Sequence, residues 1–100
     1  MNLSVVTYYE VLNGLYYKDT RKQLDRFLEF AKLNTVLPLT PNCAQRAAEI
    51  FAELRKQGQI IGHNDVLIAG TAIVNDLVLV TNNVNHFGRI PGLSVDNWSE

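Results

Sequence analysis

The fold is decided by residues 61–83, which read IGHNDVLIAGTAIVNDLVLVTNN. Asn64 is a suitable N-cap for a helix that begins after a short loop. That helix is apolar nearly all round, which is typical of a buried helix, and Gly70 would let a neighbouring backbone approach it closely. The apolar run Leu77–Thr81 follows, and it indicates a strand inside a parallel sheet.

The segment before this stretch has clear start and stop signals for a long helix. Thr40 and Pro41 form an N-cap followed by proline at the first helical position. An apolar stripe then predicts a helix over residues 41–57, and Gly58 supplies the C-terminal stop. A short strand over residues 35–39 is predicted just before it.

The first thirty residues predict a strand and two helices. Residues 3–6 form a β-branched run, and Thr7 with Glu10 has the spacing of a capping box at the start of a helix. This helix is expected to end near Tyr17. Apolar residues at helical spacing over residues 24–31 then predict a second, amphipathic helix.

The C-terminal end completes the predicted order of elements. Residues 82–93 are predicted to form a loop, and residues 94–98 a last edge strand. The order is then β-α-α-β-α-α-β-β, without internal repeats or low-complexity tracts. This order predicts one α/β domain over residues 1–100, with a three-layer α/β/α arrangement around a mostly parallel sheet.

The composition excludes several classes of protein. A chain of 100 residues with 47% apolar and 19% charged residues has room for one core, and a net charge of −1 argues against a polycationic surface. Its apolar runs are far shorter than the ~20 residues that span a bilayer, and its first residues lack the pattern of a secretory signal, so we expect a cytoplasmic protein without a membrane segment. Cys43 is the only cysteine, which excludes an intrachain disulfide. It is expected to be a buried helix residue.

Glu10, Asp65 and Asn83 share a position in the predicted topology. The first two lie in the opening turn of a predicted helix, and the third follows the end of a strand, so all three belong to the edge of an α/β sheet where ligands bind. Their oxygen atoms suit Mg²⁺ or Mn²⁺ beside a substrate phosphate, which makes a nuclease a natural candidate. The structural alternative is that Glu10 completes a capping box and Asp65 complements a helix dipole.

Other polar groups have weaker patterns. His63 and His86 could act as general bases or metal ligands, but no histidine motif surrounds them. A basic stripe could contact a phosphate backbone, although Asp25 and Glu29 dilute it and favour a solvated helix face. This stripe consists of Lys18, Arg21, Lys22 and Arg26. The four tyrosines of the first helix favour core or oligomer packing over base stacking.

Three segments carry a resemblance to a known family. Residues 61–72, 79–83 and 87–98 closely resemble the C-terminal half of PIN-domain ribonucleases, in particular the VapC-type toxins of bacterial toxin-antitoxin pairs. Residues 3–14 are similar to the strand-Thr-x-x-Glu-x-x-x-Gly segment of that family. The resemblance implies an endoribonuclease that uses Mg²⁺ or Mn²⁺, cuts RNA, forms a homodimer and is silenced by a cognate antitoxin.

The resemblance also implies a role for each matched residue. Glu10 and Asp65 would be acidic metal ligands, and Asn83 would take the fourth ligand position and orient a ligand water. Thr81 would hold this loop by hydrogen bonding. The basic stripe would then contact RNA.

Two departures from the family pattern affect the expected activity. Family members begin with a central strand that ends in an aspartate, and this chain starts at what resembles the second strand. The gap would be filled by closure of the sheet, by a strand exchanged within a dimer, or by residues missing from an incomplete sequence. In addition, His86 stands where many relatives have an acid, so metal affinity should be lower.

Two functions therefore stay open. The first is a metal-dependent endoribonuclease whose activity is weak in this chain. The second is a non-catalytic module that keeps the surface for dimerisation or for antitoxin binding.

Overall fold

The computed structural model describes residues 2–81 and 84–97. Its contacts divide the chain into two compact units, Met1–Pro38 and Leu39–Glu100. The elements in chain order are β1 (Asn2–Ser4), α1 (Val5–Lys18), α2 (Arg21–Lys32), β2 (Thr35–Leu37), α3 (Pro41–Lys56), α4 (His63–Val74), β3 (Leu79–Thr81), α5 (Val84–Phe87) and β4 (Val95–Asn97). None of the helices in these described ranges is long and apolar enough to cross a membrane.

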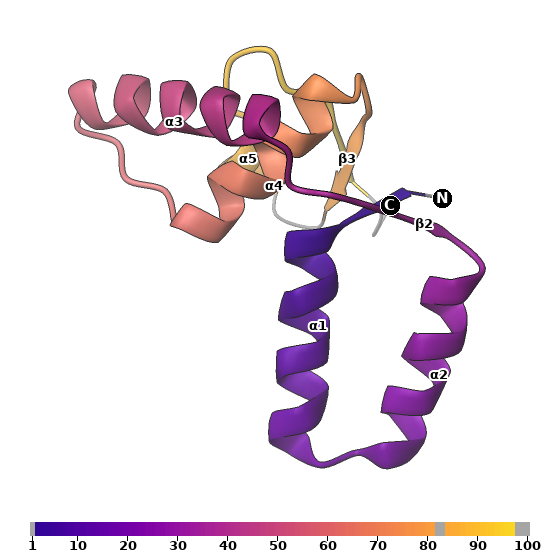
Figure 1. Ribbon diagram of the computed structural model, residues 1–100. Coiled ribbons are helices and arrows are strands. Elements are labelled where there is room, and N and C mark those ends of the chain that lie inside the picture. Colours follow the sequence, from indigo (N-terminus) through magenta and orange to yellow (C-terminus); the bar gives the residue numbers. More distant parts are fainter. Residues whose placement is uncertain (1, 82–83, 98–100) are drawn as a thin grey trace. The chain divides into compact units, whose positions relative to one another are not determined.

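The first unit is a helical hairpin attached to a pair of parallel strands. β1 pairs with β2 in parallel, with Leu3 opposite Val36, and α1 and α2 run antiparallel beside each other (Figure 1). The ring of Tyr8 on α1 contacts that of Phe27 on α2, with 5.7 Å between the ring centres. The buried apolar side chains of this unit are those of Val6, Leu24 and Ala31.

The start of α1 differs from the sequence prediction. Ser4 is the N-cap, because its hydroxyl accepts a hydrogen bond from the backbone N–H of Thr7 at 3.0 Å. The helix therefore begins at Val5, and β1 is shorter than predicted. The prediction that Thr7 caps this helix and forms a capping box with Glu10 is wrong, since both residues lie inside the helix.

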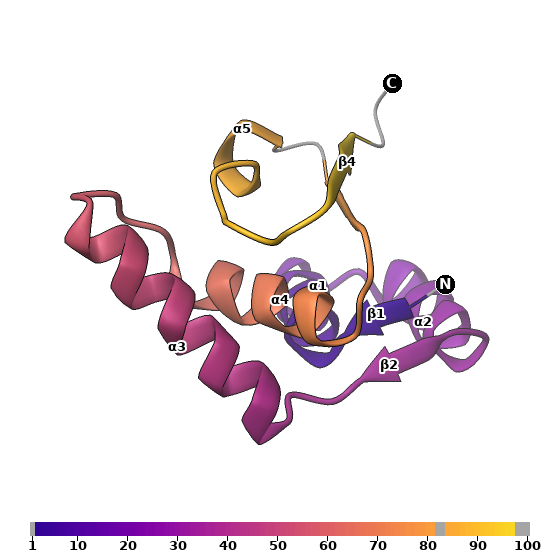
Figure 2. The same cartoon turned by 90° about the horizontal axis from the view of Figure 1, so that it is seen from above.

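The second unit is built on the packing of α3 against α4, which lie alongside each other (Figure 2). Thr40 caps α3 as predicted, with its hydroxyl accepting from the backbone N–H of Cys43 at 3.2 Å. Gly58 follows the helix with φ of 75°, a conformation that favours glycine. Gly70 also has its predicted role, since a Cβ there would lie 2.7 Å from the carbonyl oxygen of Cys43.

The core of the second unit draws on both helices and on the segments that follow them. Cys43 is a buried helix residue, as predicted, with 1% of its surface exposed. The buried cluster consists of Ala47, Ile50, Leu54, Ile61, Val66, Ala69, Phe87 and Ile90. Leu79 and Val95, which pair across the parallel strands β3 and β4, pack against this cluster.

Some elements differ from the prediction. Gly62 is the N-cap of α4, so the prediction of Asn64 in that role is wrong and Asn64 lies in the first turn. The predicted loop over residues 82–93 contains the short helix α5 (Figure 2). The described strands are three residues each and form two separate parallel pairs, β1 with β2 and β3 with β4.

Candidate functional site

Asp65 lies in the first turn of α4, which is the position that the sequence predicted. Gly62 directly before the helix has an extended backbone, so the chain enters the first turn at His63. The Asp65 carboxylate is favoured there by the helix dipole. Its side chain is 34% exposed, which leaves it accessible to a ligand from solvent.

The carboxylate of Asp65 meets the imidazole of His86 from a distant part of the second unit. Nε2 of His86 lies 3.0 Å from Oδ2 of Asp65, and the two residues are 21 positions apart in the chain. The ring nitrogen donates in this hydrogen bond, because an ionised carboxylate only accepts. The structure thus joins the start of α4 to the segment that follows the carboxyl end of β3, the kind of edge where α/β sheets bind ligands.

Neighbouring contacts fix the backbone of His86. Phe87 beside it is buried in the core cluster, and the two rings meet edge to face with 5.2 Å between their centres. The backbone N–H of Gly88 donates to the carbonyl of Val84 at 2.6 Å, which closes the turn of α5. Arg89 donates from Nε to the carbonyl oxygen of His86 at 3.3 Å. These contacts fix the backbone that carries the imidazole beside Asp65.

Other predicted site residues occupy different positions. Glu10 lies in the second turn of α1, in the first unit, and its side chain is exposed. The prediction that it lies in an opening turn is wrong, which also removes its structural role as a capping partner. Thr81 is the last residue of β3 and is half-buried. Asn83 lies outside the described residues.

The basic stripe and the tyrosines of the first unit are largely exposed. Lys18 is the last residue of α1, and the other three basic residues lie on α2, where Arg21 pairs with Asp25 at 3.4 Å. This ion pair agrees with the prediction that acidic residues on the same helix partly neutralise the basic stripe. Tyr9, Tyr16 and Tyr17 are also exposed, so core packing is wrong for these three.

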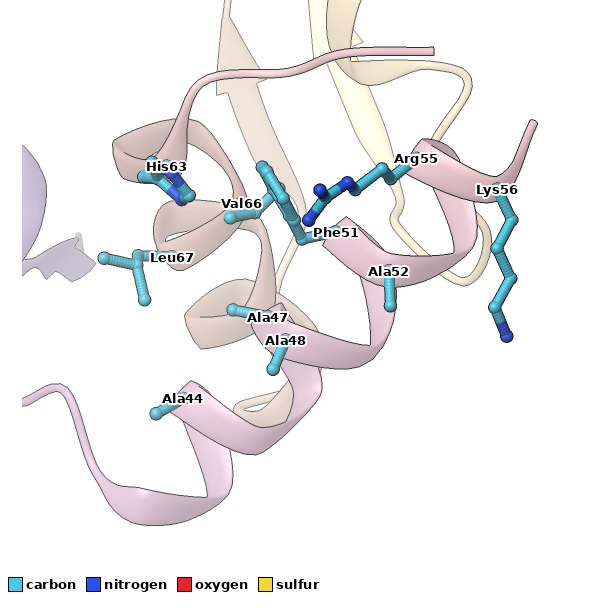
Figure 3. A pocket seen from close by; sticks show the side chains of 10 residues that line it. All are labelled: Ala44, Ala47, Ala48, Phe51, Ala52, Arg55, Lys56, His63, Val66 and Leu67. Atoms are coloured by element: carbon cyan, nitrogen blue, oxygen red, sulfur yellow. The ribbon is translucent and has the colours of Figure 1, made fainter. Parts of the chain in front are cut away.

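A groove on the surface of α3 and α4 was not predicted. It has a volume of about 550 Å³ and is lined by Ala44, Ala47, Ala48, Phe51, Ala52, Arg55, Lys56, His63, Val66 and Leu67 (Figure 3). Small side chains on α3 leave this space open, and the stacked rings of Phe51 and His63, with 4.6 Å between their centres, lie within it. The spacing of Ala44, Ala48 and Ala52 was its signal in the sequence, because residues four apart share a helix face.

The donors near Asp65 suit a divalent cation in part. Oδ2 of Asp65 and Nε2 of His86 lie 3.0 Å apart, and both side chains are partly exposed. Nowhere in residues 2–81 and 84–97 do three His, Cys, Asp or Glu side chains come together. An ion held by this pair would therefore need further ligands from water, from a substrate phosphate or from other residues.

Comparison with known proteins now places the chain in a family. The PIN domain model matches residues 2–93. Ribonuclease VapC2 of Rickettsia felis is 36% identical over 92 residues, which is 92% of this chain and 66% of that protein. A tRNA(fMet)-specific endonuclease VapC of Shigella flexneri is 34% identical over 100 residues, or 99% of this chain and 76% of the relative. The chain belongs to the PIN-domain family, in its VapC branch.

Solved structures of VapC proteins have the same fold. The DNA-bound VapBC of Salmonella typhimurium matches 98% of this VapC-family chain and 75% of the compared chain, with a TM-score of 0.89 and 33% identity. VapBC2 of Rickettsia felis, bound to a DNA fragment from its promoter, matches with a TM-score of 0.86 over 95% of this chain and 72% of its own. The predicted PIN-like α/β fold is thereby confirmed.

This VapC-family sequence spans only part of the length of the relatives that it matches. It spans 66% of the length of the Rickettsia felis ribonuclease and 53% of a VapC2 from Haemophilus influenzae to which it is 41% identical over 70 residues. The sequence analysis identified His86 as a departure from the family pattern, but it did not predict the contact of His86 with Asp65. Its place directly before Phe87 was the signal for this contact in the sequence.

Proposed function

We propose that this chain carries the ion-binding site of a metal-dependent endoribonuclease of the VapC type. The observation that carries the proposal is the contact between Asp65 and His86, 3.0 Å apart at the edge formed by the start of α4 and the end of β3. Nucleases of this family generally depend on a divalent metal ion. The pair supplies two of the ligands that such a site needs, and the others would come from water, a substrate phosphate or other residues.

Asp65 is the central ligand in this proposal, with Mg²⁺ or Mn²⁺ as the ion. Asn83 is a further ligand in this proposal, and Thr81 supports the loop that follows β3. When bound there, the ion would activate water for attack on a phosphodiester and would neutralise the charge that develops on the phosphate. The protein's own part is to hold the carboxylate of Asp65 at a fixed, partly exposed position on a rigid helix.

RNA is the proposed substrate, with initiator tRNA as the first to be tried. Two relatives, from Shigella flexneri and Salmonella typhimurium, are named tRNA(fMet)-specific endonucleases, and they are 34% and 41% identical to this chain over the matched residues. The exposed basic stripe of the first unit would contact the phosphate backbone, and Arg21 would contribute least because Asp25 neutralises it. Because the net charge of the chain is −1, the attraction to RNA would come from this local basic surface and not from the charge of the whole molecule.

An antitoxin is the proposed protein partner, and a homodimer the proposed assembly. The solved relatives from Rickettsia felis and Salmonella typhimurium are VapBC assemblies, and so is VapBC-1 from nontypeable Haemophilus influenzae, which is 31% identical to this chain. The exposed tyrosines Tyr9, Tyr16 and Tyr17 offer an apolar surface for such contacts.

Cleavage of initiator tRNA by the purified chain in Mn²⁺ or Mg²⁺ tests the enzymatic proposal. Asp65→Asn removes the negative charge while keeping the shape, and we expect the single-turnover rate to fall at least about 100-fold. Asp76→Asn is the matched control, because Asp76 lies beyond the other end of α4 with φ of 55°, where asparagine is well tolerated. Cleavage should also stop when the metal is removed by a chelator.

The same assay can overturn the proposal. Cleavage that is equally fast in Asp65→Asn and Asp76→Asn would show that Asp65 has no part in the reaction. A complete lack of metal-dependent cleavage, with the fold intact, would favour the second function.

That second candidate is a non-catalytic module that binds an antitoxin. The open groove on α3 and α4 favours it, since this surface is largely apolar and has Arg55 and Lys56 in its lining. Co-purification of the chain with a small antitoxin, unchanged by Asp65→Asn, would support the module. A chain that captures no antitoxin would count against it.

A further inference from the structure

We propose that His86 is itself a ligand of the ion, so that the site offers a nitrogen donor and prefers a first-row transition ion such as Mn²⁺ to Mg²⁺. This inference rests on the proposed function, because it assigns a further ligand and an ion preference to the same site. Nitrogen from imidazole suits transition ions, whereas Mg²⁺ selects oxygen donors.

The distance between the two donor atoms fits joint coordination of one ion. Two ligand atoms at about 2.1 Å from an octahedral ion, and at right angles to each other, are about 3.0 Å apart. The separation of Nε2 of His86 and Oδ2 of Asp65 is 3.0 Å. An ion could replace the hydrogen bond once the imidazole turns by about 45°, because the lone pair of Nε2 would then point at the ion and not at Oδ2, with the ring carrying its proton on Nδ1.

The surroundings of His86 hold the ring ready for this role. Its neighbour Phe87 is buried in the core and contacts the ring edge to face, and the His86 carbonyl accepts from Arg89. The side chain itself keeps 23% of its surface exposed, and that of Asp65 keeps 34%. An ion and its waters can therefore reach the pair from solvent, while the backbone beneath stays fixed.

The other histidine provides a matched control within the same unit. His63 lies in the first turn of α4, as Asp65 does, but its ring stacks on Phe51 in the groove. Its side chain is also exposed. A general effect of removing an imidazole near the start of α4 would appear in both histidine variants, whereas coordination would be lost only with His86.

Electron spin-echo spectroscopy of Mn²⁺ bound to the purified chain tests the coordination directly. A directly bound imidazole nitrogen modulates the echo of the manganese electrons, and we expect this modulation in the unmodified chain and in His63→Gln. It should disappear in His86→Gln, which keeps a side-chain donor for Asp65 but no imidazole. Nitrogen modulation that persists in His86→Gln would overturn the proposal.

Ion preference gives a second readout, measured as the ratio of Mg²⁺ to Mn²⁺ dissociation constants by competition. His86→Asp restores an all-oxygen site, and we expect the ratio to fall at least about tenfold toward Mg²⁺. An unchanged ratio would contradict a ligand role for His86.

The outcomes separate this inference from the proposed function. Suppose that Mn²⁺ binds, that its binding requires Asp65, and that the spectrum shows no nitrogen modulation. The metal site would then be supported, and His86 would be refuted as its ligand. Failure of the unmodified chain to bind Mn²⁺ would refute both.

Discussion

Thr40 shows at the scale of one residue how the sequence starts an element. Its hydroxyl accepts from the backbone N–H of Cys43 at 3.2 Å, and it also donates to the sulfur of Cys43 at 3.2 Å. Burial raises the pKa of the Cys43 thiol, but hydrogen bonds from Thr40 and Thr71 outweigh it and hold the pKa below its ordinary value. One side chain therefore caps α3 and sets the environment of a buried thiol.

Replacing Thr40 by alanine should lower the free energy of unfolding. The cap hydrogen bond is lost and a helix N–H is left without its partner, which costs about 1 kcal/mol. Thr40→Ser keeps a hydroxyl in the same place and should retain most of this stability. Urea denaturation of both variants checks the prediction, and equal losses in the two variants would contradict the capping role.

Residue patterns predicted local structure well where the signal lay within a few positions. The Thr40-Pro41 start and the Gly58 stop were read from the sequence because caps depend on adjacent residues. The start of α1 was missed because Ser4 and Thr7 are both good caps, and the choice between them depends on where β1 stops pairing with β2.

The candidate site could be predicted only in part for a physical reason. Asp65 was found because its place near a helix start is a local property, whereas its partner His86 lies 21 residues away and is brought in by the packing of Phe87. Glu10 was placed one turn too early, since its helix begins at Val5 rather than after Thr7. Contacts between residues that are far apart in the chain can be identified only once the fold is known.

At the scale of elements, the contact of α3 with α4 depends on one glycine. A Cβ on Gly70 would lie 2.7 Å from the carbonyl oxygen of Cys43 and 3.0 Å from the backbone nitrogen of Ala47. Both are backbone atoms of α3, which cannot move without displacing the helix. The close approach of the two helices therefore requires glycine at this position.

Gly70→Ala should destabilise the chain by about 1–3 kcal/mol, because α3 and α4 would have to separate. Gly14→Ala makes the same change in α1, where nothing lies within 4 Å of the added Cβ, and should stabilise by about 0.5–1 kcal/mol. Denaturant unfolding of the pair measures both effects. A neutral Gly70→Ala would contradict the tight packing of the two helices.

At the scale of the whole molecule, the two units differ in how much they bury. The core cluster lies entirely in the second unit, whereas the first unit buries Val6, Leu24 and Ala31 and exposes several large apolar side chains. Among those exposed are Tyr17 and Leu33. We therefore expect the second unit to be the more stable part of the chain.

Amide hydrogen exchange should reveal this difference. The slowest amides are expected in α3 and α4, around Ile50 and Ala69, because their opening requires the core cluster to separate. The amides of α2 should exchange faster. Exchange that is uniformly slow in both units would show that the first unit is stabilised to the same extent as the second.

The most direct test of the account is calorimetric titration of Mn²⁺ into the purified chain and its variants. We predict saturable binding in the unmodified chain and in Asp76→Asn, and an affinity at least about tenfold lower in Asp65→Asn, since the carboxylate beside His86 is the central ligand. Equal affinity in the two asparagine variants would contradict the central claim, because the ion would then bind elsewhere.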